Sequence, residues 1–177
     1  MIDSRAGNLR ADSLLPCAVD LYIGLGSNLD APIQQVQQAL LELASLPHTE
    51  MISHSQLYRS DPLGPADQPD YINAVAHLRS RLQPEPLLDQ LQALEQKHQR
   101  VRLQHWGPRT LDLDILLFGK QQIATARLSV PHPQLSQRNF VLYPLQEIAP
   151  ELQLPQGKSI AQLITHCDRG TLAPVQV

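Results

Sequence analysis

The chain has 177 residues, of which 42% are hydrophobic and 18% charged, and a formal net charge of −3. This length and composition suit one domain with a substantial buried core and exclude a largely disordered chain. The mild acidity argues against a general nucleic-acid-binding protein. No apolar run approaches the ~20 residues of a membrane span, and the N-terminus shows no secretion signal. We therefore expect a cytoplasmic protein without a nucleic-acid or membrane partner, in which Cys17 and Cys167 are free thiols.

The chain changes character at about residue 20. Residues 1–20 show no sustained hydrophobic period, which predicts a loosely ordered N-terminal extension, and residues 21–177 are predicted to form a single domain. Residues 21–26 are a short apolar run that ends in Gly-Ser-Asn. This pattern predicts a strand that runs into a turn.

Two amphipathic helices are predicted. The first follows Asp30, the expected N-cap residue, begins near Pro32 and ends before Pro47. Its apolar residues recur at helical spacing: Ile33, Val36, Leu40, Leu43 and Leu46. The second runs from Pro84 to about residue 100, with four leucines facing inward: Leu87, Leu88, Leu91 and Leu94. Each pattern gives a helix one buried face.

The remaining segments predict strands, short helices and one functional loop. Extended segments are expected over residues 51–59, 72–78, 110–118, 123 and 128–130, and short helices over 140–148 and 159–166. Residues 60–70 hold three prolines and a glycine and predict an ordered loop, which is often functional. The order β-α-β-β-α-β predicts an α+β fold with a ferredoxin-like βαββαβ core and helices packed on a mostly antiparallel sheet.

A pair of aspartates lies in the strand predicted over residues 110–118. Because side chains alternate between the faces of a strand, Asp112 and Asp114 share one face, with Cα atoms about 6.6 Å apart. Two adjacent carboxylates are costly unless a cation lies between them, and Mg²⁺ commonly takes one or two carboxylates plus waters and substrate phosphates. The pair therefore indicates a metal site for phosphoryl transfer, and the alternative is a solvated acidic edge.

The segment before these aspartates is basic. It has no acidic residue from residue 97 to residue 110, and its cations are Lys97, Arg100, Arg102 and Arg109. Arginine binds phosphate oxygens through two parallel hydrogen bonds and neutralises charge that develops during transfer. The combination predicts a polyphosphate site, and the alternative is that these arginines form ordinary ion pairs with Asp112 and Asp114.

Two other segments add candidate binding groups. His132 and Arg138 lie in a loop after the last predicted strand, and they become functional only if that loop returns to the phosphate site. Tyr71 and Asn73 alternate on a strand and can face one pocket together. A ring and an amide suit a flat heterocycle, because the ring stacks on its face and the amide bonds its edge.

Five ordered blocks of this sequence resemble the 6-hydroxymethyl-7,8-dihydropterin pyrophosphokinase family of folate biosynthesis, between about residues 21 and 152. The blocks are YIGLGSN (22–28), YRSDPLGP (58–65), DQPDYIN (67–73), WGPRTLDLDI (106–115), and VPH (130–132) with Arg138 and Phe140. The resemblance implies transfer of diphosphate from ATP to the hydroxymethyl group of the pterin, with release of AMP.

The resemblance also implies roles for single residues. Asp112 and Asp114 would hold two Mg²⁺ ions, and Arg100 and Arg109 would act with them in catalysis. The implied ATP-binding residues are Gln92, Glu95, Arg102, Trp106, Ile115, Arg127, Ser129, His132 and Arg138. The implied pterin-binding residues are Ser60, Asp61, Leu63, Tyr71, Asn73 and Phe140.

Two other functions stay open at this point. A metal-dependent nucleotide hydrolase could use the same aspartates and arginines, and it would consume ATP without a pterin. A non-catalytic pterin- or nucleotide-binding module would bind its ligand and release no AMP. In each case we expect a monomer that binds small molecules.

Overall fold

The computed structural model describes residues 9–99 and 109–177. The strands are β1 (Leu14–Ser27), β2 (Thr49–His54), β3 (Tyr58–Ser60), β4 (Tyr71–Leu82), β5 (Asp112–Phe118), β6 (Ile123–Ala124), β7 (Ser129–Val130) and β8 (Ala173–Pro174). The helices are α1 (Pro32–Ala44), α2 (Pro84–Lys97), α3 (Asn139–Ile148) and α4 (Ile160–Ile164), with 3₁₀ turns η1 (Ala11–Ser13) and η2 (Leu135–Gln137).

The central sheet has the order β5-β1-β4-β3-β8, and β2 also pairs with β4. Strands β2 and β3 follow one another along the same edge of β4, and the pairings in this sheet are antiparallel. The predicted α+β fold and the ferredoxin-like βαββαβ order are therefore confirmed. The two-residue strand β8, which pairs with β3, was not predicted from the sequence.

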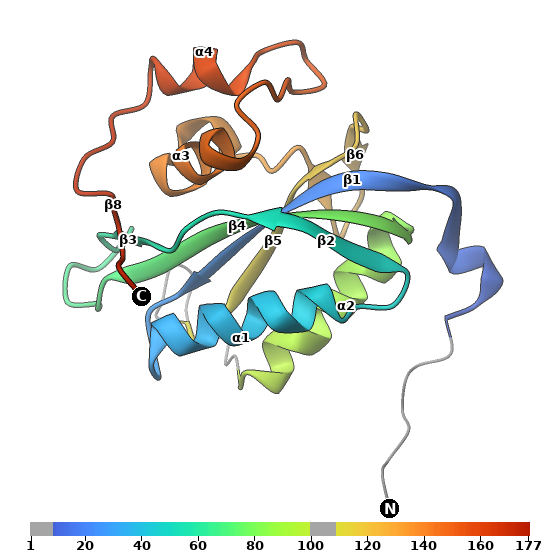
Figure 1. Ribbon diagram of the computed structural model, residues 1–177, viewed down its shortest axis with the longest axis horizontal. Coiled ribbons are helices and arrows are strands. Elements are labelled where there is room, and N and C mark those ends of the chain that lie inside the picture. The colour runs from blue at the N-terminus through green and yellow to red at the C-terminus, as the bar shows by residue number, and fades with distance from the viewer. Residues whose placement is uncertain (1–8, 100–108) are drawn as a thin grey trace, which may run out of the picture.

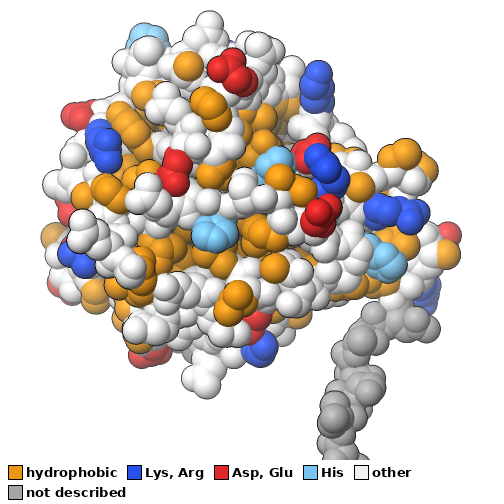
Figure 2. All heavy atoms as spheres, viewed as in Figure 1, with side chains coloured by type: hydrophobic (Ala, Val, Ile, Leu, Met, Phe, Trp, Pro, Cys, Tyr) orange, Lys and Arg blue, Asp and Glu red, His pale blue; other side chains and the backbone are white. Residues whose placement is uncertain are grey.

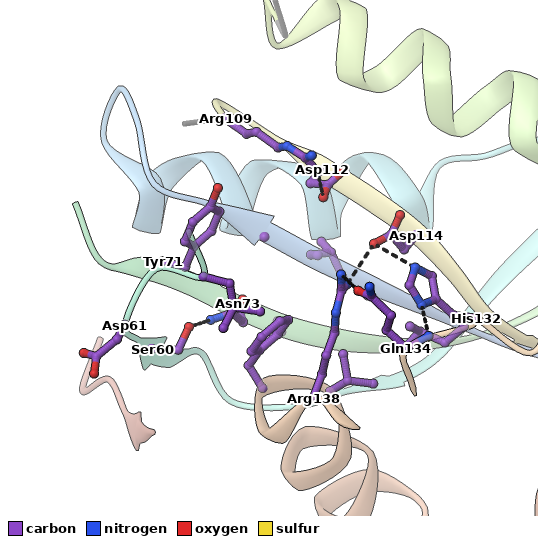
Figure 3. Close-up of a pocket in the computed structure, with 18 of the residues that line it drawn as sticks. Ser60, Asp61, Tyr71, Asn73, Arg109, Asp112, Asp114, His132, Gln134 and Arg138 are labelled. Atoms are coloured by element: carbon purple, nitrogen blue, oxygen red, sulfur yellow. Dashed lines mark hydrogen bonds and ion pairs between the residues drawn. The ribbon is translucent and has the colours of Figure 1, made fainter. Parts of the chain in front are cut away.

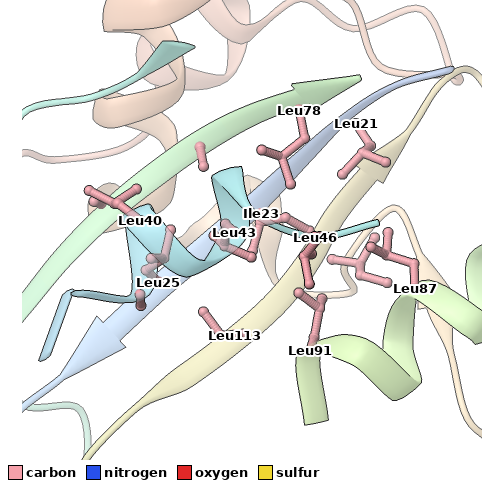
Figure 4. Close-up of a cluster of buried hydrophobic side chains, with 14 of the residues drawn as sticks. Leu21, Ile23, Leu25, Leu40, Leu43, Leu46, Leu78, Leu87, Leu91 and Leu113 are labelled. Atoms are coloured by element: carbon pink, nitrogen blue, oxygen red, sulfur yellow. The ribbon is translucent and has the colours of Figure 1, made fainter. Parts of the chain in front are cut away.

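The helices cover both faces of this sheet. Helices α1 and α2 lie on one face, and α3 and α4 lie on the other (Figure 1). The hydrophobic side chains divide into two clusters to match, one under α1 and α2 and one under α3 and α4. Leucines from β1, α1, β4, α2 and β5 contribute to the first cluster (Figure 4). The sheet therefore separates two cores, and its α3 face is the one that carries the site described below.

Strand β1 begins at Leu14, which is earlier than the sequence pattern predicts. Residues 14–20 were expected to be part of a loose extension, but Leu14 pairs with Leu82 and Val19 pairs with Ser80. The ladder is irregular between Leu14 and Val19, so this part of the strand lacks the strict two-residue alternation that identifies a strand in a sequence.

The start of α1 also differs from the prediction. Pro32 occupies the first turn as expected, but the N-cap residue is Ala31, which has left-handed backbone angles and makes no side-chain cap. Asp30 has a positive φ of 53° and uses its backbone oxygen, which accepts from Gln35 Nε2 at 3.1 Å. Asp30 is therefore not the N-cap, because the tight turn that precedes the helix moves the boundary by one residue.

The molecular surface shows no broad region of one charge in the view of Figure 2. Acidic and basic side chains are interspersed across this face, and hydrophobic side chains are scattered between them. Within residues 9–99 and 109–177, no helix is long and apolar enough to cross a membrane.

Candidate active site

The two aspartates lie on the α3 face of β5. Leu111, Leu113 and Ile115 pack in the cluster under α1 and α2, whereas Leu116 packs in the cluster under α3 and α4. Asp112 and Asp114 alternate with the first three side chains and line a cavity on the opposite face. The prediction that these two carboxylates share one face is confirmed.

The cavity has a volume of about 380 Å³ and lies between the sheet, the loop after β7 and the start of α3. Strand β1 contributes Gly24 and Gly26 to its floor. A Cβ atom added at Gly26 would lie 3.6 Å from Asn73 Oδ1 and 3.7 Å from Tyr71 Cδ1. The glycine therefore leaves open the space that a larger side chain would take between the sheet and a bound ligand.

One end of the cavity is charged. Arg109 Nη1 donates to Asp112 Oδ2 in an ion pair, and Arg138 Nη1 lies 3.9 Å from Asp114 Oδ2 (Figure 3). His132 Nε2 lies 3.7 Å from the same Asp114 oxygen. The arrangement places two arginines and a histidine around two carboxylates. For Arg109, the ion pair with Asp112 is the alternative left open above for the basic segment, whereas Arg138 comes from the loop before α3.

Burial dominates the electrostatics of Asp114. Burial and, next, the charge of Asp112 raise the pKa of Asp114 to about 7, although Arg138 and Arg109 act in the opposite direction. Burial alone would lower the pKa of Arg109, but the charge and hydrogen bond of Asp112 raise it. A second negative charge beside Asp112 is therefore disfavoured at this end of the cavity.

His132 has a defined tautomer at this end. Its Nδ1 atom accepts a hydrogen bond from the backbone N–H of Gln134 at 3.2 Å, so the proton of the neutral ring is on Nε2 and faces Asp114. Burial lowers the pKa of His132, with a contribution from Arg138. The ring is therefore a neutral donor at pH 7 and a poor proton acceptor toward the cavity.

The other end of the cavity carries a ring and an amide. Tyr71 and Asn73 project from β4, and Ser60 lies beside them at the end of β3 (Figure 3). Asn73 is buried, and its Nδ2 donates to Ser60 Oγ at 2.8 Å and to the Tyr58 carbonyl oxygen at 3.3 Å. These bonds fix the amide so that its Oδ1 atom is the group left to accept from a ligand.

Arg138 connects the two ends. Its guanidinium carbon lies 5.5 Å from the centre of the Phe140 ring, at a distance typical of a cation–π contact. Its Nη2 atom donates to Gln134 Oε1. Arg138 is the residue directly before α3, and Phe140 is the second residue of the helix. The start of α3 therefore places an aromatic ring and a cation beside each other in one cavity.

A family comparison decides what kind of protein carries this site. A model of the 7,8-dihydro-6-hydroxymethylpterin-pyrophosphokinase (HPPK) family matches residues 22–150 of the chain. The chain belongs to the HPPK family. It is therefore an enzyme of the pyrophosphokinase class that acts in folate biosynthesis on a pterin substrate.

Curated relatives of this HPPK chain extend over most of its length. The 2-amino-4-hydroxy-6-hydroxymethyldihydropteridine pyrophosphokinase of Pseudomonas aeruginosa is 53% identical over 147 residues, covering 83% of this chain and 91% of the relative. The protein of the same name in Haemophilus influenzae is 49% identical over 146 residues, covering 82% and 91%.

Solved structures confirm the fold. An HPPK-DHPS structure in complex with substrates aligns with a TM-score of 0.71 and 12% identity, over 91% of this chain and 47% of that one. HPPK-DHPS of Plasmodium falciparum aligns with a TM-score of 0.67 and 14% identity, over 84% and 44%. This chain spans less than half of those longer chains, and at such identity the likeness concerns the fold alone.

The structure brings most of the predicted HPPK site together. All six predicted pterin-binding residues line the cavity: Ser60, Asp61, Leu63, Tyr71, Asn73 and Phe140. The two aspartates line it as well, together with Arg109, His132 and Arg138. Three further predicted residues, Arg100, Arg102 and Trp106, lie outside the described residues.

Five predicted ATP-binding residues do not line this cavity. They are Gln92, Glu95, Ile115, Arg127 and Ser129. Ile115 is buried in the cluster under α1 and α2, and Glu95 Oε1 accepts from the Leu113 backbone N–H at 2.9 Å. Arg127 Nη2 binds Asp89 Oδ1 at 2.5 Å and lies 3.4 Å from Gln92 Oε1. Their role in binding ATP stays a prediction.

Several residues of the site were not found from the sequence. Gly24 and Gly26 form part of the cavity floor, and Gln134 lies against Arg138. Asn28 is buried beside the cavity and bonds the backbone of Arg109. Gly24, Gly26 and Asn28 lie within the block YIGLGSN, and Gln134 lies two residues after VPH, so the ordered blocks are the signal that could have found them.

The carboxylate pair fits a divalent cation that also binds substrate. In the part of the chain that the structure describes, no group of three or more His, Cys, Asp or Glu side chains could hold a metal. Asp112 and Asp114 offer two carboxylates on one face of the cavity, where a second negative charge is disfavoured without a cation. Mg²⁺ usually takes such a set together with waters and substrate phosphates, so the donor chemistry fits a cation that arrives with a nucleotide.

Proposed function

We propose that this enzyme transfers a diphosphate group from ATP to 6-hydroxymethyl-7,8-dihydropterin, giving AMP and the pterin diphosphate, in a reaction that depends on Mg²⁺. The observation that carries the proposal is the division of one cavity into two chemical ends. Carboxylates and arginines lie at one end, and the Tyr71 ring and the Asn73 amide lie at the other. The Phe140 ring also lines the cavity, beside Arg138. Membership of the HPPK family supports the same reaction.

The ring-and-amide end suits the pterin. Tyr71 and Phe140 provide faces on which a flat heterocycle can stack, and aromatic pairs of this kind favour offset or edge-to-face contact. Asn73 Oδ1 is held ready to accept from the N–H groups of the pterin edge by the bond from its own Nδ2 to Ser60. This end therefore recognises the shape and the hydrogen-bonding edge of the substrate.

The charged end suits the triphosphate. Arg109 and Arg138 each present a guanidinium that can bind two phosphate oxygens. The two Mg²⁺ ions proposed for Asp112 and Asp114 supply charge neutralisation of the phosphates when bound. Arg109 and Arg138 can exchange their carboxylate partners for phosphate oxygens, which would turn the ion pairs of the free enzyme into substrate contacts.

The reaction needs little covalent chemistry from the protein. The oxygen of the pterin hydroxymethyl group forms a bond to the β-phosphorus of ATP, and the bond from that phosphorus to the α,β-bridging oxygen breaks. AMP leaves with the bridging oxygen and its electron pair, and the hydroxyl proton passes to solvent. The chain's contribution is to align the two substrates and to stabilise the charge, since His132 holds its proton on the nitrogen that faces Asp114.

One assay tests the proposal. The purified protein is incubated with ATP and Mg²⁺, with and without 6-hydroxymethyl-7,8-dihydropterin, and nucleotides are separated by chromatography. We expect AMP in an amount equal to the pterin diphosphate formed, no AMP without the pterin, and none after chelation of the cation. AMP or ADP formed without the pterin would instead support the nucleotide hydrolase. Binding of both ligands by calorimetry without any AMP would support the non-catalytic module.

We also propose that the protein acts as a monomer in the cytoplasm. Among the described residues, this one chain supplies both the groups proposed to bind the pterin and the groups proposed to bind the phosphates, so the proposed site needs no residue from a second copy. Sedimentation in the presence of substrates tests this, and a dimer that forms at the concentration used for activity would contradict it.

A further inference from the structure

Asn28 lies directly after β1 and connects two segments that border the cavity. It is buried, with only 2% of its surface exposed. Its Oδ1 atom accepts from the Arg109 backbone N–H at 2.8 Å. Its Nδ2 atom donates to the Pro69 carbonyl oxygen at 3.1 Å and lies 3.4 Å from Gln68 Oε1. One side chain thus contacts residues 41 positions away on one side of the site and 81 positions away on the other.

The contact with Arg109 has two hydrogen bonds. The Asn28 backbone N–H donates to the Arg109 carbonyl oxygen at 3.0 Å, while the Arg109 N–H donates to the Asn28 side chain. Strands β1 and β5 pair without a register shift from Ile23 and Ile115 to Gly26 and Asp112. Just past this ladder, Asn28 bonds both the N–H and the carbonyl oxygen of Arg109, with its side-chain oxygen as the acceptor. It therefore holds the main chain of Arg109 where its guanidinium meets Asp112.

The second contact holds the end of the loop over residues 61–70. Pro69 lies two residues before Tyr71, where β4 begins, and Asp61 and Leu63 of the same loop line the cavity. A hydrogen bond to the Pro69 carbonyl oxygen therefore sets how the loop enters the strand that carries Tyr71 and Asn73. Asn28 is buried whereas Pro69 is exposed, so loss of this bond would free the end of the loop from β1 rather than bury an unpaired carbonyl group.

We propose that Asn28 is a positioning residue that keeps Arg109 and the 61–70 loop in a fixed relation to each other. This inference rests on the proposed function, in which Arg109 contacts the transferred phosphates and the loop contacts the pterin. Transfer between two substrates depends on their alignment, and small displacements of a positioning group cost large factors in rate. Asparagine suits the position because it offers an acceptor to one segment and a donor to the other.

Two substitutions separate the two contacts. Asn28→Asp keeps an oxygen for the Arg109 N–H but turns an acceptor toward the Pro69 carbonyl and Gln68 Oε1, so it selectively breaks the loop contact. Asn28→Ala removes both side-chain contacts. The matched control is Ser159→Ala, which removes the capping box of α4 and lies away from the cavity. Loss of such a cap lowers stability without disturbing the site.

Steady-state kinetics form the first readout. We expect Asn28→Asp to raise the KM for the pterin about tenfold with a smaller change in kcat, and Asn28→Ala to lower kcat/KM about a hundredfold. The kcat loss of Asn28→Ala should shrink at least about threefold when Arg109 is already alanine, because Asn28 acts on kcat by positioning the Arg109 guanidinium, which that variant lacks. Two results would overturn the proposal. In the first, Asn28→Ala folds and its kcat and both KM values stay within about twofold of the parent. In the second, the kcat loss of the double variant equals the product of the losses of Asn28→Ala and Arg109→Ala.

Amide hydrogen exchange forms a second readout that needs no catalysis. The Arg109 amide and the amides of residues 70–71 should exchange faster in Asn28→Ala than in the parent, while Ser159→Ala leaves them unchanged. Unchanged exchange at both segments in folded Asn28→Ala overturns the inference. If the parent forms no AMP with the pterin, the proposed function fails, and the exchange result still decides whether Asn28 holds the two segments together.

Discussion

Arg138 faces Asp114 across the cavity, with Nη1 3.9 Å from Oδ2, while the same guanidinium lies against the ring of Phe140. One cation therefore touches both the carboxylate pair and the aromatic surface on which we propose the pterin stacks. This arrangement places the phosphate end and the pterin end of the cavity side by side, as transfer of a group between the two substrates requires.

Removal of either carboxylate charge should abolish turnover. We expect Asp112→Asn and Asp114→Asn each to lower turnover to below about 1% of the parent at saturating Mg²⁺, because the pair would hold the Mg²⁺ that neutralises the triphosphate. The folded state should persist, since burial already opposes the charge on Asp114. AMP release and thermal unfolding measure the two effects. Asp12→Asn, on the exposed turn η1, is the control, and near-normal turnover in either site variant would refute the metal assignment.

Arg109→Ala should act on turnover rather than on pterin binding. The guanidinium pairs with Asp112 at the phosphate end, so its loss removes charge stabilisation during transfer. We expect kcat to fall about a hundredfold while the Kd for the pterin, from calorimetry, changes less than about threefold. Arg10→Ala, at the exposed N-terminal turn, is the control. A defect confined to pterin affinity would count against this role.

Phe140→Ala should weaken pterin binding. The ring lines the cavity beside Arg138, and loss of an aromatic contact costs about 0.5–1.5 kcal/mol beyond the buried area. We expect the pterin KM to rise about tenfold and the ATP KM to stay within about twofold, with an intermediate value for Phe140→Leu. Both constants come from one initial-rate data set. An equal rise in the KM values for the pterin and for ATP would contradict the assignment of Phe140 to pterin binding.

A pH effect on stability is expected at the junction of α1 and α2. Burial raises the pKa of Glu42, but hydrogen bonds from Lys97 and His98 outweigh it and lower the pKa below its ordinary value of 4.5. The stabilisation is therefore fully present above about pH 4.5 and is lost as the pH falls through the lowered folded-state value.

Urea unfolding of Glu42→Gln against the parent measures this effect. We expect the variant to be less stable at pH 7 and the difference to shrink below pH 4.5, where Glu42 becomes protonated in the unfolded chain and then in the folded one. Lys97→Gln should reproduce only part of the loss, because Lys97 is exposed and His98 Nε2 still binds Glu42 at 2.7 Å. A difference that stays constant from pH 7 to pH 3 would contradict the prediction.

Local patterns in the sequence predicted most of the elements that build the site. The leucines of α1 and α2 repeat at helical spacing, and the buried face of β4 alternates with Tyr71 and Asn73, so periodicity identified both helices and strands. The pattern failed at residues 14–20, where an irregular ladder interrupts alternation, and at β8, which has only two residues. Neither segment is long enough or regular enough to produce a period.

Sequence alone determined which residue types and which faces take part: the shared face of Asp112 and Asp114 follows from strand alternation, and the ordered blocks identify the family. Only the tertiary structure decided that Asn28 joins Arg109 to Pro69 and that Arg138 lies between Asp114 and Phe140. The physical reason is the sequence separation over which each kind of information acts. Periodicity reports the few residues of one turn or one strand, whereas these contacts join segments that meet because two cores close on one sheet.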